Sequence, residues 1–350
     1  MRSANRMGQQ WIKYRSKNLF VHKAICAPDF NSPTVLTGDP WNYVSLWMRR
    51  HKHERSRFFW DQSRHFYDAT SNLPPTSAPL TAYYSIMNAT KALLYVKNVR
   101  AAPSHGVTGS SRAGRTSLSN EMVRFKNGGV HAGLRAYLSE APPSNDVSLK
   151  DLLYNMPFVH RAFTLTYSDS ELFIPIKHPR FVKKAGSSQA WFCADIQGGQ
   201  YQNNHVINKL PTEFERDMGR PDSWTIRMKK RFKWRNGSQN LEGNLLRLTN
   251  YHAQVRNHVS YIHGATRLWY VKRSPVRGAM SYHDMTLIYA AMHRLSELAR
   301  YSPDVLDKHF SGQHNWLMME FISSALDQFI DDIASEITGQ DFMVTGLRAQ

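Results

Sequence analysis

Apolar side chains recur at helical spacing in the first third of the chain and again near its end. Residues 41–70, which follow Asp39-Pro40, repeat large apolar side chains every three or four positions, and residues 80–98 do so more regularly. Residues 281–300 and 313–338 show the same period. This period and a proline at the first helical position are both typical of amphipathic helices. We therefore predict long helices in these segments, with residues 80–98 at the centre of a helical body.

Shorter segments between these helices carry their own start, stop and turn signals. Residues 146–156 predict a capped helix that ends before Pro157, and residues 121–134 predict a short strand, a Gly-Gly turn and a helix. Residues 100–117 are rich in Gly, Ser and Arg, which predicts a loop. Residues 241–262 return to the helical period and predict a further helix.

The middle of the chain changes to short aromatic or β-branched runs between turn residues. Such runs are typical of β-strands. They are Phe163–Tyr167, Leu172–Ile176, Ala190–Ile196, Trp224–Phe232 and Arg267–Lys272. The predicted fold class is therefore α+β, with a mainly helical body and a β-rich middle section.

This pattern divides the chain into four parts. We expect a basic N-terminal arm at residues 1–39, a helical domain at 40–157, a strongly basic β-rich section at 158–275, and a C-terminal helical pair at 276–350 that packs on the helical domain. Helices flank the strands on both sides in sequence. The strands are therefore either an insertion in a helical domain or a separate middle domain.

Charge is distributed unevenly along the chain. Its 350 residues include 45 Lys and Arg against 27 Asp and Glu, a formal net charge of +18. Residues 1–60 hold 11 cations against 3 acidic residues, residues 227–277 hold 12 against 1, and residues 278–350 hold 4 against 10. A concentrated positive charge indicates a polyanionic partner such as nucleic acid. The acidic end can pair with the chain's own basic segments or with a basic partner subunit.

Composition excludes several other classes of protein. Apolar residues make up 41% of the chain, which is enough to build a folded core. The sequence has no run of eighteen apolar residues and no secretory signal. Cys26 and Cys193 are too few for a disulfide framework. We expect a cytoplasmic protein with reduced thiols, no membrane span and no cofactor.

Four separated blocks of sequence resemble one known family. Residues 79–94 (PLTAYYSIMNATKALL) precede a loop that ends in His105-Gly106. The other blocks are DLLYNMPFVHRAF at 151–163, RLWYVK at 267–272 and LSELARYSPDVL at 295–306. Together they resemble the YaaC-like proteins over most of residues 40–340. That family is not assigned a reaction, so the resemblance implies a fold and not an activity.

A wider resemblance is to HEPN domains, helical bundles found in RNases of toxin–antitoxin and antiviral systems. It rests on residues 84–105, in which a helix with Tyr and a Lys-Ala-Leu run precedes a His-Gly loop. The HEPN catalytic motif is Arg, four to six residues and His, often with a polar residue after the Arg. Arg100 and His105 match with four intervening residues but have an alanine after the Arg. Arg256 and His263 match with six, the longest permitted spacing, and Asn257 takes the polar place.

Arg256 and His263 are the stronger catalytic candidates, and Arg100 and His105 are the second pair. Residues seven apart on a continuous helix share one face about two turns apart. His can accept the proton of a 2′-hydroxyl near neutral pH, and Arg can stabilise charge on the phosphate. The resemblance therefore implies a metal-independent endoribonuclease. The structural alternative is that Arg256 makes an ion pair and that His263 ends the helix before Gly264.

The segment Arg227–Arg235 (RMKKRFKWR) alternates cations with apolar side chains. On a strand, its odd-numbered cations would project from one face and could contact phosphates, while neighbouring aromatic rings could stack on bases. The alternative is a solvated basic strand, or one that contacts an acidic helix or a partner protein. The predicted nucleic-acid-binding residues are Arg227, Lys229, Lys230, Arg231, Lys233, Trp234, Arg235, Lys272 and Arg273.

Motifs for other enzyme chemistries are missing from the sequence. It has no phosphate-binding GxxxxGK[ST], no GxGxxG after a strand, no HExxH and no CxxC. Asp331, Asp332 and Glu336 form an acidic group on the last predicted helix. We expect them to face solvent opposite the apolar stripe, so no metal site is predicted.

Three functions are compatible with these observations. The first is a nucleic-acid-binding component, for RNA or DNA, of a prokaryotic multi-protein system of the antiviral defence type. The second is a HEPN-like endoribonuclease. The third is a non-catalytic assembly subunit that docks an acidic protein partner or forms a homo-oligomer.

Overall fold

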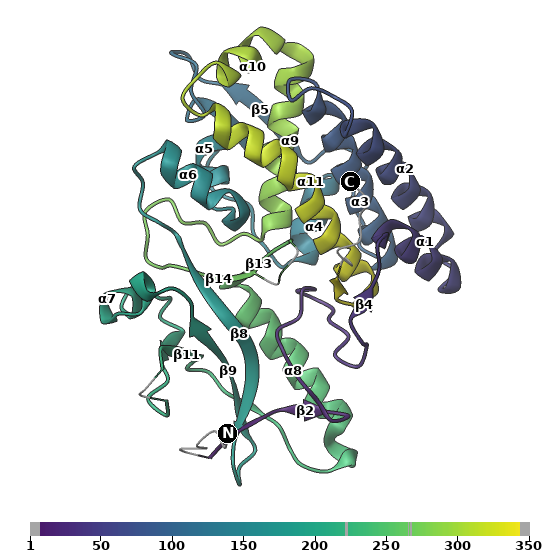
Figure 1. Ribbon diagram of the computed structural model, residues 1–350. Helices are drawn as coiled ribbons and strands as arrows, with labels where there is room; N and C mark the ends of the chain where they lie inside the picture. Colours follow the sequence, from purple (N-terminus) through teal and green to yellow (C-terminus); the bar gives the residue numbers. More distant parts are fainter. Residues whose placement is uncertain (1–7, 221–222, 265, 267, 344–350) are drawn as a thin grey trace. The chain divides into compact units, whose positions relative to one another are not determined.

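The computed structural model describes residues 8–220, 223–264, 266 and 268–343 (Figure 1). Helices and strands are mixed along the chain, which confirms the α+β class. The chain divides into two compact units, each built from two separate stretches of sequence. We call residues 1–33 and 172–279 the sheet unit, and residues 34–171 and 280–350 the helical unit.

The main sheet of the sheet unit has eight antiparallel strands among the described residues. Six of them lie in the order β10, β11, β9, β8, β14, β13, while β1 pairs with β8 and β12 pairs with β9. The strands are β1 (Gln9–Trp11), β8 (Phe173–Lys184), β9 (Gln189–Ile196), β10 (Phe214–Arg216), β11 (Thr225–Met228), β12 (Phe232–Lys233), β13 (Val259–Ile262) and β14 (Leu268–Lys272). Strands β2 (Lys13–Tyr14) and β3 (Lys17–Asn18) form a separate hairpin.

Helix α8 (Leu241–Arg256) covers one face of this sheet (Figure 1). Its residues Leu248, Tyr251 and Val255 lie on one side of the helix and join the same core cluster as Phe192 of β9. Residues 191 and 193 of β9 lie on the other face, because successive side chains of a strand point to opposite sides. The short helix α7 (Asn204–Ile207) and the 3₁₀ turns Gly199–Tyr201 and Ser238–Asn240 complete the unit.

The helical unit packs its helices around α3. Helix α3 contacts α2, α9 and α11 and is buried on most of its surface, as predicted for residues 80–98. The helices are α1 (Pro40–Arg50), α2 (Glu54–Thr70), α3 (Ala78–Val96), α4 (Val130–Tyr137), α5 (Leu149–Tyr154), α6 (His160–Thr166), α9 (Asp284–Tyr301), α10 (Pro303–Phe310) and α11 (Asn315–Thr338), with a 3₁₀ turn at Pro157–Val159. None of the described helices has the length and apolar composition that crossing a membrane requires.

Two small groups of strands belong to the helical unit. Strands β5 (Val107–Ser111), β6 (Glu121–Phe125) and β7 (Val147–Ser148) form an antiparallel sheet in that order. Strands β4 (Val35–Leu36) and β15 (Phe342–Met343) pair in parallel. The predicted loop at 100–117 is therefore wrong for residues 107–111, which pair with β6 along its whole length. Cross-strand pairing outweighs their weak strand propensity.

Several other elements differ from the prediction. Residues 8–33, predicted as part of a basic N-terminal arm, pack on the sheet: β1 pairs with the end of β8, and Leu19 and Val21 are in the sheet core. The run Phe163–Tyr167 is not a strand, since residues 160–166 form α6 and bury Ala162 and Phe163. Burial of that apolar face overrides a β-propensity that amounts to about 1 kcal/mol. Helix α10 was not predicted.

Candidate functional site

The predicted basic strand at residues 227–235 is interrupted in the structure. Strand β11 ends at Met228, and only Phe232 and Lys233 pair again as β12. The prediction of one continuous row of cations is therefore wrong. Residues 229–235, which we call the basic loop, instead bury Phe232 and Trp234 and expose their cations. These exposed cations are Lys229, Lys230, Arg231, Lys233 and Arg235.

Side chains of α8 fix the backbone of the basic loop. Three of them donate to loop carbonyl oxygens: Tyr251 to Lys230 (2.8 Å), Arg247 to Lys233 (2.9 Å) and Asn244 to Arg235 (2.7 Å). Asn244, which is 2% exposed, also accepts from the backbone N–H of Arg235 at 2.9 Å. Residues 244, 247 and 251 share one face of the helix because they are three and four positions apart. The loop therefore holds its cations on a fixed backbone.

The tip of the β8–β9 hairpin adds two more cations at this edge of the sheet, Lys183 on one face and Lys184 on the other, because successive side chains of a strand point to opposite sides. Lys183 donates to Asn236 at 2.8 Å, and β12 pairs with β9 through Lys233 and Gln189. None of these cations has a carboxylate partner among the described residues. We call the seven residues Lys183, Lys184, Lys229, Lys230, Arg231, Lys233 and Arg235 the basic surface.

The whole net charge of the protein belongs to the sheet unit. Residues 1–33 and 172–279 contain 25 Lys and Arg against 7 Asp and Glu, which equals the total of +18. Residues 34–171 and 280–350 contain 20 of each, a net charge of zero. The acidic end noted in the sequence is thus balanced by cations of its own unit.

Four of the predicted nucleic-acid-binding residues lie outside the basic surface. Arg227 is half-buried and pairs with Glu215 at 2.8 Å across β10 and β11. Lys272 and Arg273 lie beside Phe173 and Leu172, at the opposite end of the 12-residue strand β8 from Lys183. With about 3.3 Å per residue, that separation is on the order of 30 Å. Trp234 is only 7% exposed and belongs to the sheet core.

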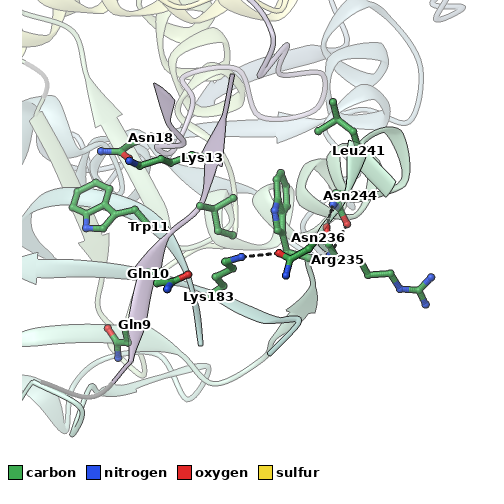
Figure 2. Close-up of a pocket in the computed structure, with 13 residues that line it drawn as sticks. Gln9, Gln10, Trp11, Lys13, Asn18, Lys183, Arg235, Asn236, Leu241 and Asn244 are labelled. Carbon is green, nitrogen blue, oxygen red and sulfur yellow. Dashed lines mark hydrogen bonds between the residues drawn. The ribbon is translucent and has the colours of Figure 1, made fainter. Parts of the chain in front are cut away.

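A pocket of about 720 Å³ lies beside the basic surface, between β1 and the start of α8 (Figure 2). Its apolar lining residues are Trp11, Ile12, Trp234 and Leu241. Polar side chains line the rest, namely Gln9, Gln10, Lys13, Asn18, Lys183, Arg235, Asn236 and Asn244. Figure 2 shows the side chain of Arg235 extending away from the others. The pocket thus combines an apolar floor with a rim of amides and cations.

Arg256 and His263 do not share a helix face. Helix α8 ends at Arg256, and strand β13 (Val259–Ile262) separates it from His263. The run VSYI has the alternation of a half-buried strand, which the helical period of the preceding residues concealed. Arg256 is 5% exposed, and its Nη1 donates to the carbonyl oxygens of His22 (3.1 Å) and Lys23 (3.0 Å). Its guanidinium stabilises the fold of the sheet unit.

Arg100 and His105 lie in the helical unit and face different surroundings. Arg100 is exposed and lines a cavity of about 870 Å³ with Arg55 and Lys91. His105 does not line that cavity among the described residues. Its backbone is bound to α4, because the N–H of His131 donates to its carbonyl oxygen at 3.1 Å. The structure therefore gives no direct pairing between Arg100 and His105.

A close backbone approach holds His105 in place. Gly129 has a φ of +105°, and a Cβ there would lie 2.5 Å from the backbone nitrogen of Gly106. Only glycine can adopt this φ and leave room for the Gly106 nitrogen without displacement of the loop. The Gly-Gly turn predicted from the sequence thus positions the His-Gly loop.

The ring of His105 belongs to a short hydrogen-bonded cycle with two tyrosines. The Tyr83 hydroxyl lies 2.5 Å from His105 Nδ1 and 3.3 Å from the Tyr289 hydroxyl, which donates to the His105 carbonyl oxygen at 3.0 Å. One arrangement lets each group donate once. In it, the protonated Nδ1 of His105 donates to the Tyr83 hydroxyl, and the Tyr83 hydroxyl donates to the Tyr289 hydroxyl. Nε2 then keeps its lone pair and has no hydrogen-bond partner among the described residues. This nitrogen can accept a proton.

The surroundings of His105 favour the neutral ring. Burial lowers its pKa below the usual 6.5, and the charges of Arg300 and Lys91 lower it further. Burial also lowers the pKa of neighbouring His293, to about 3. We expect ¹⁵N-detected NMR to find His105 as the neutral Nδ1–H tautomer at pH 7. Because Lys91 disfavours the protonated ring, Lys91→Met should raise the pKa of His105. A protonated ring or an Nε2–H tautomer in the wild-type protein would contradict the cycle.

A buried polar network behind His105 was not predicted from the sequence. Arg294 of α9 binds Glu121 of β6 at 2.6 Å and Glu297 at 3.1 Å. His309 of α10 lies 3.1 Å from Glu121 and 2.8 Å from His314. No motif links these residues, because they are up to about 190 positions apart and meet only through the fold.

Strand β5 lies directly against this network. A Cβ on Gly109 would lie 2.0 Å from a carboxylate oxygen of Glu297, whose other oxygen accepts from the Gly109 N–H at 3.2 Å. Glycine is therefore the residue that lets the strand approach α9. The Gly and Ser residues that favoured a loop here serve this close packing.

The acidic group on the last helix is buried, which corrects the prediction that it faces solvent. Asp331, Asp332 and Glu336 are 5%, 7% and 1% exposed. Gln328 donates to Asp332 at 2.9 Å, and Tyr137 donates to Glu336 at 2.7 Å. Polar partners from neighbouring turns and from α4 allow these carboxylates to lie inside the helical unit. No cluster of His, Cys, Asp or Glu suited to a metal ion occurs among the described residues.

Comparison with known proteins gives one match. A family model described as YaaC-like Protein matches residues 31–337, which include most of both units. No curated protein and no solved structure matches the chain. The resemblance to YaaC-like proteins is therefore confirmed, and the resemblance to HEPN domains stays a prediction.

Proposed function

This chain belongs to the YaaC-like family, and we propose that it binds the phosphate backbone of a nucleic acid with the basic surface of its sheet unit. The observation that carries the proposal is the accumulation of seven cations without carboxylate partners among the described residues. Arg227, by contrast, is neutralised by Glu215 within the same sheet. Phosphate oxygens are suitable partners for such unpaired cations.

The construction of the basic surface also supports this function. Like charges held side by side repel one another, so their accumulation is unfavourable without a bound anion. The hydrogen bonds from α8 hold the backbone of the basic loop in one conformation, which reduces the entropy lost on binding. The helical unit, by contrast, has a net charge of zero.

Salt dependence tests this proposal directly. Each phosphate that a cation neutralises contributes roughly 0.9 to the slope of log K against log salt, so about six contacts lower the affinity about a thousandfold or more between 50 and 200 mM salt. We expect this loss in fluorescence anisotropy with labelled RNA or DNA. A salt-independent affinity would reject the proposal. An acidic protein that copurifies after nuclease treatment would then favour the docking function.

A further inference from the structure

The pocket beside the basic surface has the chemistry of a site for one nucleobase. Its apolar floor consists of Ile12, Trp234 and Leu241, of which Leu241 is the most exposed, and an apolar surface suits the face of a planar base. Its volume of about 720 Å³ lies within the range of small-ligand pockets, about 300–1,000 Å³.

The rim of the pocket can form hydrogen bonds with the edges of a base. The side chains of Gln10 and Asn18 are exposed and make no hydrogen bond with a described residue. Asn236 accepts from Lys183 with its oxygen, and its Nδ2 has no described partner. An amide both donates and accepts, as the edges of nucleobases do. Three amide side chains are thus available at one rim.

The position of the pocket connects it to the phosphate-binding residues. Lys183 and Arg235 belong to the basic surface and also line the pocket. Trp11 is different, because its indole lies on the other side of β1 from Lys183 and Asn236 (Figure 2). There its ring packs against Arg180, whose Cζ is 5.3 Å from the ring centroid. Trp234 also lines the pocket, but only 7% of its surface is exposed, so the pocket contributes apolar contact and not an open indole face.

We propose that the pocket holds one unpaired base of a single-stranded nucleic acid whose phosphates contact the basic surface. The inference rests on the proposed function and names its substrate class. In a duplex, the faces of the bases are stacked and their pairing edges are occupied, so a base must leave the helix to enter a pocket. A single strand offers its bases without that cost. RNA and DNA share this chemistry.

A comparison of strands tests the inference. Labelled single-stranded RNA and DNA of twelve nucleotides, and the duplex of the same DNA sequence, are titrated with the full chain at one salt concentration. We expect each single strand to bind at least tenfold tighter than the duplex. The double variant Gln10→Ala/Asn236→Ala removes no charge and should weaken single-strand binding about tenfold, while the salt slope and duplex affinity stay unchanged.

Matched controls separate failure of the pocket from failure of the basic surface. The double variant Asn72→Ala/Gln313→Ala removes two exposed amides from the helical unit and should leave every affinity unchanged. Salt-dependent binding with equal affinity for single strand and duplex would overturn the inference and leave the proposed function standing. If the Gln10→Ala/Asn236→Ala variant binds a single strand as tightly as the wild-type protein does, the inference is also overturned and the proposed function stands. Absence of all nucleic-acid binding would reject both.

Discussion

Replacement of Arg231, Lys233 and Arg235 with alanine is expected to lower the affinity for nucleic acid about 500-fold at 0.1 M salt. Each lost phosphate contact removes roughly 0.9 from the slope of log K against log salt, so three remove about 2.7. At about 1 M salt the electrostatic contribution to binding is nearly absent. Between about 1 M and 0.1 M the logarithm of the salt concentration changes by about one, so this slope change also lowers log K by about 2.7 at 0.1 M. Anisotropy titrations over several salt concentrations measure both quantities.

The fold of the triple variant is expected to stay intact. The three side chains are exposed, and α8 binds the loop through backbone atoms that alanine retains. A control of equal charge is Arg49→Ala/Arg50→Ala/Arg161→Ala, which removes three exposed cations from the helical unit. We expect this control to change the affinity only a few-fold. Equal losses in both variants would mean that net charge, and not the basic surface, determines binding.

Much of the secondary structure could be predicted from the sequence, because long periodic segments report the burial of one face. Helices α1, α2, α3, α9 and α11 and strands β9 and β14 lie where the pattern predicts them, and β8 begins in the predicted run but continues beyond it to Lys184. The errors concern short segments whose local propensity competes with tertiary contacts. Gly109 leaves room for Glu297 against its backbone, and this long-range contact is not visible in the sequence.

The candidate site was predicted only in part. The local density of cations identified the basic loop, since a charge excess can be counted without a fold. The contribution of Lys183 was not predicted, because strand pairing brings it to the loop from a distant position. Arg256 illustrates the opposite error. Its spacing to His263 matches a catalytic motif, but a strand separates the two residues and Arg256 binds backbone carbonyl oxygens.

Glu121→Ala is expected to destabilise the helical unit by about 3–5 kcal/mol. The substitution removes the closer of the two carboxylates that bind Arg294, whose side chain is only 7% exposed, and breaking a buried ion pair by removal of one partner carries a cost of this size. It also removes the acceptor for His309 and for the Ser111 hydroxyl, which donates at 2.8 Å. Hydrogen exchange of the β6 and α9 amides, followed by mass spectrometry, measures this loss of stability within the helical unit.

A second ion pair on the same strand is the matched control. Arg124 of β6 forms two hydrogen bonds with Asp146 at 2.8 and 2.9 Å, but its side chain is 69% exposed. Exposed pairs contribute little because water and salt screen them. Asp146→Ala should therefore leave the exchange of the helical unit nearly unchanged. A similar loss in both variants would show that the cost at Glu121 does not come from burial of Arg294.

The pH dependence of the same pair gives an independent check. Burial alone would raise the pKa of Glu121, but hydrogen bonds from His309, Arg294 and Ser111 outweigh it and lower the pKa below its usual value of 4.5. A carboxyl group whose pKa is lower in the folded state stabilises the fold above its unfolded pKa and loses that contribution as pH falls through the folded pKa. The stability difference between the wild-type protein and Glu121→Gln should therefore stay constant from pH 7 to about pH 5 and shrink below it. A difference that grows on acidification would mean that Glu121 is protonated in the folded protein, and that its contact with Arg294 is not an ion pair.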